Sequence, residues 1–136
     1  KGPLDTQILD FIENINNVEF VGFRDKHGVS NILEKSDALL IPSNHEQWSV
    51  VTHEAAFAGN VILSSNSVGA NACFLIEGYN GYSYDVSLDG SLKRILEEMD
   101  RMPQSMLEQM KNNSITLGQR ITVETSAANF LSILWK

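Results

Sequence analysis

The fold of this chain is decided by residues 38–63, ALLIPSNHEQWSVVTHEAAFAGNVIL. The stretch begins and ends with apolar runs, residues 38–41 and 61–63, in which polar and apolar residues do not alternate. Such runs are typical of strands that are buried on both faces of a parallel sheet. Between them, Ser49 can cap a helix, and Gly59 stands where a helix C-terminus favours glycine. The stretch therefore predicts a buried strand, a helix and a second buried strand.

The rest of the chain continues this alternation of strands and helices. Strands separated by helices at this spacing are typical of βαβ units with right-handed crossovers. We therefore expect an α/β fold with a doubly wound parallel sheet. The further expected elements are a helix capped by Thr6 with an apolar inner face, a strand at 18–22, a short helix capped by Ser30, a helix at 70–76, a strand at 82–84, and helices carrying apolar residues at 92–99, 106–110 and 130–135.

Length and composition limit the kind of protein. With 136 residues, of which 43% are hydrophobic and 20% charged, the chain can form one globular domain. No apolar run reaches the roughly 18 residues of a membrane span, and the first residues resemble no signal peptide. The net charge of −7 argues against a nucleic-acid partner, because such binding depends on Lys and Arg. We therefore expect a soluble, cytoplasmic, acidic domain without a transmembrane segment.

Several motifs of known chemistry are missing from the sequence. It contains no G-x-G-x-x-G, no P-loop and no G-x-S-x-G. The two His-Glu pairs fail as H-E-x-x-H, because Ser49 and Phe57 occupy the positions of the second histidine. Cys73 is the only cysteine, which excludes a cysteine-rich zinc site and an internal disulfide. We expect no bound metal, and we expect the three histidines to be surface or packing residues.

Two glutamates lie around the start of the central helix. Glu46 belongs to the loop after the first buried strand, and Glu54 lies on the helix with seven residues between them. This loop is at the carboxyl edge of the sheet, where open α/β folds bind their ligands. Carboxylates there can accept hydrogen bonds from sugar or ribose hydroxyls, and the amides near Ser49 can bind phosphate. The arrangement predicts a site for a phosphorylated, hydroxyl-rich ligand.

These residues resemble the E-x7-E signature of retaining GT-B glycosyltransferases, in particular glycosyltransferase family 4. The usual form is P-S-x-x-E-x-[FW]-[GS]-x-[VA]-x-x-E-A-x-x-x-G, which residues 42–59 follow. Other parts of the family's pattern occur in the right order, namely NVEFVGF at 17–23, SDALLIPS at 36–43, VGAN at 68–71 and EGYNG at 77–81. The resemblance implies the Rossmann-like C-terminal half of a GT-B fold.

The resemblance also implies a role for each part of the site. Glu46 would be the catalytic glutamate that contacts the hydroxyls of the donor sugar, and Glu54 would bind the ribose hydroxyls. The other implied donor-binding residues are Trp48, Ser49, Val50 and Val51 through their amides, Phe23 and Arg24 at the nucleobase with Ser43 nearby, and Gly69 and Ala70 at the diphosphate.

Two helix starts should face the diphosphate. We expect the helices that begin near Ser49 and near Ala70 to expose unpaired N–H groups toward one crevice. Gly69 would let the backbone approach the ligand, so that a valine there would block binding and leave stability mostly intact. No cofactor or metal is implied, because the nucleotide-sugar is a substrate.

The sequence departs from the family pattern at several points. Gln47 and Ser49 stand where glycines are common, which could narrow the sugar pocket, and Cys73 replaces a common glutamate. The family's first strand, with its diphosphate-binding Arg and Lys, and its N-terminal acceptor domain would precede Lys1. We therefore expect residues 1–136 to be a nucleotide-sugar donor-binding domain, truncated at its N-terminal edge, that folds but is inactive alone.

The implied function is transfer of a sugar from a nucleotide-sugar, expected to be UDP-linked, to a glycan or lipid-linked acceptor in bacterial surface polysaccharide synthesis. The protein would be cytoplasmic, or peripheral at the inner face of the membrane through the acceptor domain. One alternative is a GT-B sugar-nucleotide epimerase, which binds the same donor without transfer. Another is a non-catalytic α/β domain that binds a partner. Donor binding and product analysis would distinguish these functions.

Overall fold

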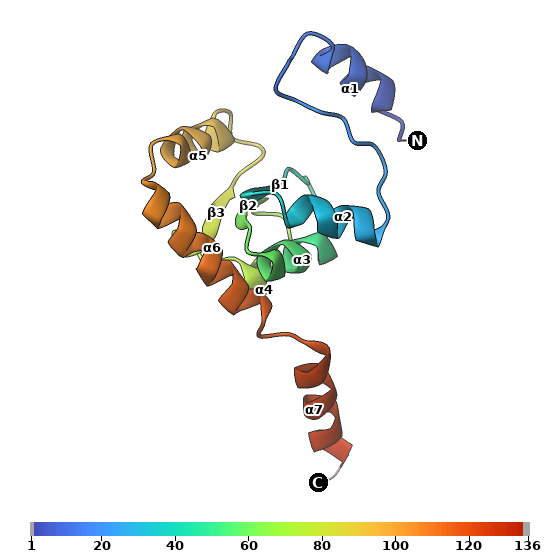
Figure 1. Ribbon diagram of the computed structural model, residues 1–136, viewed down its shortest axis with the longest axis vertical. Coiled ribbons are helices and arrows are strands. Elements are labelled where there is room, and N and C mark those ends of the chain that lie inside the picture. Colours follow the sequence, from blue (N-terminus) through green and yellow to red (C-terminus); the bar gives the residue numbers. More distant parts are fainter. Residues whose placement is uncertain (1, 135–136) are drawn as a thin grey trace.

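A computed structural model describes residues 2–134 of the protein (Figure 1). Its strands form one parallel sheet in the order β1-β2-β3, which confirms the predicted α/β fold. The elements are α1 (Asp5–Ile12), α2 (Lys26–Leu33), β1 (Ala38–Ile41), α3 (Val50–Ala58), β2 (Val61–Ser65), α4 (Asn71–Phe74), β3 (Gly81–Tyr84), α5 (Ser91–Asp100), α6 (Gln104–Gly118) and α7 (Val123–Leu134).

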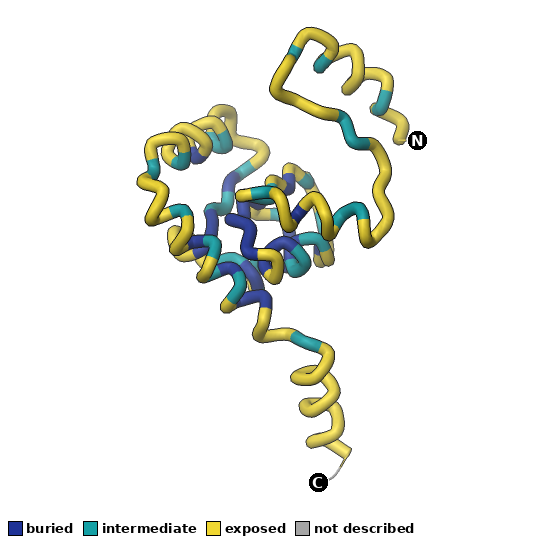
Figure 2. The backbone as a smooth tube through the Cα atoms, in the orientation of Figure 1, coloured by how far each residue is buried: buried dark blue, intermediate teal, exposed yellow. Residues whose placement is uncertain are grey.

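The central strand β2 organises two hydrophobic cores. All five of its residues are buried, and alternate side chains point to opposite faces of the sheet. Ile62 packs with Phe74 in the core beneath α3, whereas Leu63 packs with Ile95 in the core beneath α5 and α6. Figure 2 shows this buried centre in dark blue. A sheet covered on both faces is what the unbroken apolar run at 61–63 predicted.

Strand β1 is less buried than expected. It pairs with β2 through the register Leu40↔Leu63, and no described strand pairs with its other edge. As a result Leu40 is 41% exposed, so the prediction that residues 38–41 are buried on both faces is wrong. An apolar run alone does not distinguish a central strand from an edge strand.

The connection from α3 to β2 follows the prediction for Gly59. This glycine ends α3 in the left-handed conformation, with φ of 83°. The next residue, Asn60, is fully buried, and its Nδ2 donates to the Leu33 carbonyl oxygen at 3.0 Å. Asn60 thereby ties the end of α2 to the beginning of β2.

Two predicted helix boundaries are wrong because other groups compete for the backbone amides. The Asp25 carboxylate accepts from the Gly28 N–H at 2.8 Å and caps α2, so Ser30 lies inside that helix. The Asn80 side-chain oxygen accepts from the Ile76 N–H at 2.8 Å, and α4 ends at Phe74 instead of continuing to 76.

Residues 18–22 do not form the predicted strand. Their backbone makes no hydrogen bond to another segment in the described part of the chain. Because an isolated run of β-favouring residues needs a partner strand, its composition alone does not make it a strand. The segment is an extended connection between α1 and α2 (Figure 1).

The terminal helices do not cover a core. Helix α1 begins at Asp5, with Leu4 rather than Thr6 at its N-cap position, and it buries none of its residues. Phe11, on its predicted inner face, is 78% exposed. Helix α7 extends away from the sheet and likewise has no buried residue, although Phe130 was expected to pack inward (Figure 1). Trp135, predicted to share that face, lies outside the described residues.

Candidate functional site

Two loops at the carboxyl edge of the sheet are joined by main-chain hydrogen bonds. We call residues 46–48, after β1, and residues 67–70, after β2, the loop clasp. The Glu46 N–H donates to the Ser67 carbonyl oxygen at 3.2 Å, and the Gly69 N–H donates to the Glu46 carbonyl oxygen at 2.9 Å. The Ala70 N–H donates to the Trp48 carbonyl oxygen at 2.8 Å. The loop clasp therefore holds Glu46 and Trp48 in fixed positions at the start of α3.

Gly69 lets the two loops of the loop clasp approach each other. A Cβ added there would lie 2.0 Å from the Gln47 carbonyl oxygen, a distance that no side chain tolerates. The expectation that a valine at this position leaves stability intact is therefore contradicted by the geometry. Gly69 is needed because only a glycine lets the two loops approach this closely.

The second expected set of unpaired amides is already paired. The N–H groups of Gly69 and Ala70 bond to loop carbonyls, and the Asn71 N–H donates to the Val68 carbonyl oxygen at 3.2 Å. Helix α4, with four residues, is too short to present an anion site of its own. The prediction of two helix starts with unpaired amides is therefore wrong for this one.

The start of α3 keeps its amides available. Among the described residues, the N–H groups of Val50 and Val51 donate to no other group. Unpaired amides and the positive end of the helix dipole together favour an anion. The first residue of this helix, Val50, follows Glu46 by four residues in the chain. The structure therefore presents one amide-based anion site at the carboxyl edge of β1.

Ser49 makes the turn into α3 in an unusual conformation. Its φ of 75° makes it the one non-glycine residue with positive φ in the described chain, and the side chain is only 9% exposed. It occupies the predicted N-cap position, but its hydroxyl accepts from the Thr52 hydroxyl at 2.9 Å instead of from a backbone amide. A left-handed non-glycine residue costs roughly 1–2 kcal/mol. Strain of this kind concentrates at functional sites.

The two glutamates lie in different surroundings. Glu46 is half-buried, and its Oε1 accepts from the Trp48 N–H at 3.3 Å, so the carboxylate is oriented by its own loop. Glu54 lies four residues after Val50, which places it about 6 Å along the helix from the anion site. It is also half-buried, and it borders a groove on the outer side of α3.

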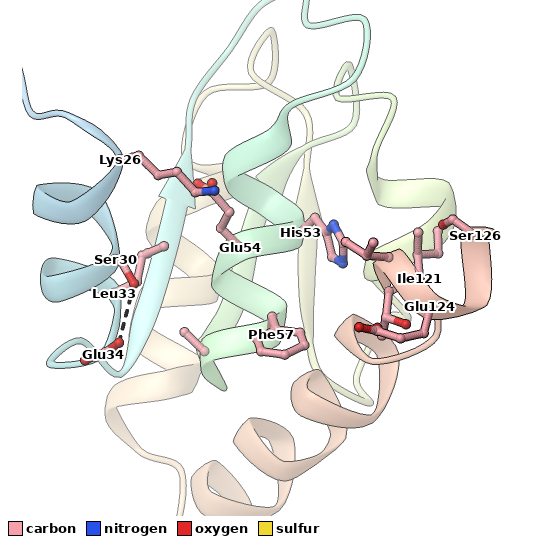
Figure 3. Close-up of a pocket in the computed structure, with 13 residues that line it drawn as sticks. Lys26, Ser30, Leu33, Glu34, His53, Glu54, Phe57, Ile121, Glu124 and Ser126 are labelled. Carbon is pink, nitrogen blue, oxygen red and sulfur yellow. Dashed lines mark hydrogen bonds between the residues drawn. The ribbon is translucent and has the colours of Figure 1, made fainter. Parts of the chain in front are cut away.

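This groove has a volume of about 930 Å³ and lies between α2, α3 and the start of α7 (Figure 3). Its lining combines apolar and charged side chains. Figure 3 shows the side chains of Lys26 and Glu54 pointing toward one another from α2 and α3. The lining includes Lys26, Leu33 and Glu34 from the side of α2, Glu54 and Phe57 from α3, and Glu124 from α7.

His53 also borders the groove, but its role is packing. Its Nε2 lies 3.0 Å from the Gly118 carbonyl oxygen, to which it must donate because a carbonyl only accepts. The ring stacks on Phe74, with centroids 4.3 Å apart and planes 9° apart. His53 therefore joins α3 to the end of α6. His27 and His45 are exposed, so all three histidines are surface or packing residues, as predicted.

The predicted nucleobase residues stand apart from the loop clasp. Phe23 is 91% exposed, and Arg24 is exposed with its Nη1 donating to the Phe23 carbonyl oxygen at 3.2 Å. No hydrogen bond or ion pair within residues 2–134 joins either residue to the loop clasp. Ser43 is closer to the loops, because its carbonyl oxygen accepts from the buried Ser65 hydroxyl.

Two residues near the site were not expected from the sequence. Thr52 orients the Ser49 hydroxyl, and the i, i+3 spacing of two hydroxyl residues at a helix start could have indicated this pair. Lys26 borders the groove together with Glu54, although the two residues are far apart in the sequence. Nothing in the sequence around Lys26 indicates that proximity.

No group of three or more His, Cys, Asp or Glu side chains within residues 2–134 could hold a metal ion. None of the helices seen in that part of the chain is long and apolar enough to cross a membrane.

Comparison with known proteins connects this arrangement to one family. The pattern of the family described as "Glycosyl transferases group 1" matches residues 6–116. The glycogen synthase of Mycobacterium tuberculosis is 36% identical over 64 residues, which are 47% of this chain and 15% of that protein. The chain thus spans less than a fifth of the length of the curated relative it matches.

Solved structures share the fold at low sequence identity. Sucrose-phosphate synthase from Thermosynechococcus elongatus superposes with a TM-score of 0.78 and 17% identity, covering 97% of this chain and 33% of that one. HepE of Anabaena in complex with UDP gives a TM-score of 0.78 and 21% identity, covering 95% of this chain and 35% of that one. The HepE complex with UDP-glucose gives a TM-score of 0.74 and 20% identity, with the same coverage. The fold is therefore that of GT-B glycosyltransferases.

Proposed function

The chain belongs to the group 1 glycosyl transferases, and from this premise we propose that it is the donor-binding domain of a retaining glycosyltransferase of family 4. Its donor is a nucleotide-sugar, in the first place a UDP-sugar. HepE, whose structures contain UDP and UDP-glucose, has the same fold and supports this choice. The acceptor binds to a second domain outside this chain.

The observation that carries the proposal is the position of the loop clasp beside the start of α3. Main-chain bonds hold the half-buried Glu46 in the loop that leads into α3, where the amides of Val50 and Val51 donate to no other described group. A nucleotide-sugar has a diphosphate next to a hydroxyl-rich ring, and this pair of features fits it. Amides and a helix dipole bind the anion without a cation, as an acidic chain requires.

The proposed roles follow the order of groups in the donor. The diphosphate lies on the amides of Val50 and Val51, with Trp48 and Ser49 shaping the turn beside it. The sugar lies at the loop clasp, where the Glu46 carboxylate accepts from its hydroxyls. The ribose lies about 6 Å along α3, where Glu54 accepts from its hydroxyls. The sugar then passes to the acceptor with its anomeric configuration retained.

Two further parts of the proposal concern the nucleobase and the setting of the enzyme. Phe23, Arg24 and Ser43 line the base, and the exposed segment around Phe23 adjusts when donor binds. The acceptor is a glycan or a lipid-linked sugar of bacterial surface polysaccharide. The enzyme works in the cytoplasm or at the inner face of the membrane, and it needs no bound metal.

The test compares two isosteric variants, Glu54→Gln and Glu46→Gln, in the protein at its full natural length. Calorimetry measures the Kd for UDP and for UDP-glucose. Glu54→Gln should weaken both ligands, because both contain the ribose. Glu46→Gln should weaken UDP-glucose and leave UDP nearly unchanged. Each variant replaces a charged acceptor by a neutral one, which should cost about 1 kcal/mol per affected hydrogen bond.

The control is Glu97→Gln on the exposed surface of α5, which should change neither affinity. Glutamine at position 46 can still accept from the Trp48 N–H, so the loop clasp stays intact. If the wild-type protein binds neither ligand, the proposed function is wrong. If Glu46→Gln weakens UDP as much as UDP-glucose, the assignment of Glu46 to the sugar is wrong. Analysis of the products then separates transfer to an acceptor from epimerisation of the donor.

A further inference from the structure

Trp48 is the aromatic residue of the loop clasp, and it is 45% exposed. Its ring meets the buried Phe74 in an edge-to-face arrangement, with centroids 6.3 Å apart and planes 78° apart. A single exposed apolar side chain is ordinary on a protein surface. Trp48 differs from such residues because both its backbone and its ring are held in place beside the proposed donor site.

Two hydrogen bonds fix the backbone of Trp48, and an aromatic contact fixes its ring. The carbonyl oxygen accepts from the Ala70 N–H at 2.8 Å, and the N–H donates to Glu46 Oε1 at 3.3 Å. Phe74, on which the indole rests, is itself stacked on His53 with centroids 4.3 Å apart. A ring held in this way loses little conformational freedom when a ligand covers it, which favours binding.

Trp48 stands between the two groups to which the proposed function assigns the ends of the donor sugar. Glu46, assigned to the sugar hydroxyls, precedes it by two residues, and Val50, assigned to the diphosphate, follows it by two. Because the Trp48 N–H bonds to the Glu46 carboxylate, the indole side chain branches from the backbone beside that carboxylate. A sugar that reaches from Glu46 to the start of α3 therefore lies next to Trp48.

We propose that the Trp48 indole stacks on the sugar ring of the donor and makes the site prefer a nucleotide-sugar to the free nucleotide. This inference rests on the proposed function and adds an aromatic side chain to a site built from amides and carboxylates. A hexopyranose carries hydroxyls around its rim and C–H groups on its faces. The flat, apolar indole covers a C–H face, while the Glu46 carboxylate accepts from hydroxyls at the rim.

The turn after Trp48 supports this role for the indole. Ser49, the next residue, is buried and turns its hydroxyl to the Thr52 hydroxyl at 2.9 Å. The loop thus directs the small polar side chain inward, whereas the large apolar one stays 45% exposed. An apolar surface next to a few oriented polar groups is typical of small-molecule sites.

The experiment compares Trp48→Leu with Trp48→Phe in the protein at its full natural length. Leucine keeps an apolar contact for Phe74 but has no flat ring, whereas phenylalanine keeps a ring. Calorimetry measures the Kd of each variant for UDP-glucose and for UDP. Trp48→Leu should weaken UDP-glucose about 10-fold and leave UDP nearly unchanged. Trp48→Phe should keep most of the affinity for UDP-glucose, because its smaller ring still covers part of a sugar face.

The control is Tyr79→Leu, at an aromatic residue that is 39% exposed and lies before β3, outside the loop clasp. It should change neither affinity. The Kd for UDP also reports on folding, because an unfolded variant would lose both ligands. If Trp48→Leu does not fold, Trp48→Met serves as the ringless variant, since its flexible apolar chain adapts to the space beside Phe74.

Three outcomes would overturn the inference. Equal losses for UDP and UDP-glucose in a folded variant would mean that Trp48 acts on the diphosphate or on the shape of the loop. Equal losses of UDP-glucose affinity in Trp48→Leu and Trp48→Phe would mean that an aromatic ring is not what the sugar requires. No loss in either variant would mean that the indole touches no sugar. If the wild-type protein binds neither UDP nor UDP-glucose, the proposed function itself fails, whereas wild-type binding with unchanged Trp48→Leu affinities rejects only this inference.

Discussion

The loop clasp and the segment before α2 were both expected to contribute to one site, and they are held in very different ways. In the loop clasp, main-chain bonds of 2.8–3.2 Å join two loops that follow neighbouring strands. In the segment at 18–25, the described side-chain bonds are local: Arg24 donates to the Phe23 carbonyl oxygen, and Asp25 caps its own helix. The sugar end of the proposed site is therefore preorganised, whereas its base end is not.

The difference shows how much of a site the sheet itself can build. The loop clasp follows strands that pair side by side, so its two loops are brought together by the sheet register. The segment at 18–25 precedes the first described strand and has no such neighbour. A substitution in a preorganised region should change the free energy of unfolding. A substitution in a loosely held region should change only the affinity for the ligand.

The largest expected effect is that of Gly69→Ala. The new Cβ would lie 2.0 Å from the Gln47 carbonyl oxygen, so the loop clasp must separate. We expect the free energy of unfolding to fall by about 3 kcal/mol, at the upper end of the cost of overpacking. Urea unfolding measures the change, and Gly69→Val should be worse.

The matched control is Gly28→Ala in α2, outside the loop clasp. There the added Cβ would lie 3.1 Å from the Cβ and Cδ of Arg24 and 3.2 Å from the Oδ1 of Asp25, both exposed residues whose side chains can shift slightly, and alanine favours the helix. Gly28→Ala should therefore be neutral or slightly stabilising. If Gly69→Ala unfolds at the same urea concentration as the wild type, the two loops do not approach each other as closely as described here.

A second substitution tests the buried Ser65 side chain, which forms a hydrogen bond with the loop clasp. The fully buried Ser65 hydroxyl donates to the Ser43 carbonyl oxygen and accepts from the Ser67 N–H at 3.3 Å. Ser65→Ala leaves both partners without it, which should cost about 1–3 kcal/mol. The control Ser30→Ala, on the exposed face of α2, should change the unfolding free energy by less, since Ser30 makes only a long bond of 3.4 Å to Glu34. Equal effects of the two substitutions would mean that the loop clasp is no better supported than α2.

A pair of variants at Ser49, the residue that follows the first loop of the loop clasp, tests whether its left-handed backbone conformation is strained. Ser49→Ala removes the hydroxyl that accepts from Thr52 and keeps a side chain at φ of 75°. Ser49→Gly removes the same hydroxyl and also the strain. Glycine should therefore be more stable than alanine by about 1 kcal/mol. If alanine and glycine give the same thermal midpoint, the left-handed conformation of Ser49 is not strained.

The sequence was sufficient to predict the strands β1 and β2 and the helix between them. Unbroken apolar runs at 38–41 and 61–63 and the helix-ending Gly59 are local signals, and β1, α3 and β2 follow them. The strand expected at 18–22 failed because pairing depends on a partner, which the composition of the run does not reveal.

For the site, the sequence indicated the residues but not the bonds among them. Glu46 and Gly69 stood out as residue types, yet the loop clasp consists of main-chain hydrogen bonds, which carry no side-chain signal. The sequence therefore did not reveal that Gly69 is also needed for the close approach of Gln47. The cap of α2 was missed because serine and aspartate both favour that role, and only the structure shows Asp25 bonded to Gly28.

The smallest expected effect on stability is that of Phe23→Ala, in the loosely held region. With 91% of the side chain exposed, its loss should change the unfolding free energy by no more than about 0.5 kcal/mol. If Phe23 covers the base in the donor complex, the same variant should weaken UDP several-fold through lost ring contact. Calorimetry with UDP and urea unfolding of one preparation measure both quantities. Loss of affinity without loss of stability would mean that the base end of the site is completed by the ligand. Unchanged affinity would confine the site to the loop clasp, α3 and its groove.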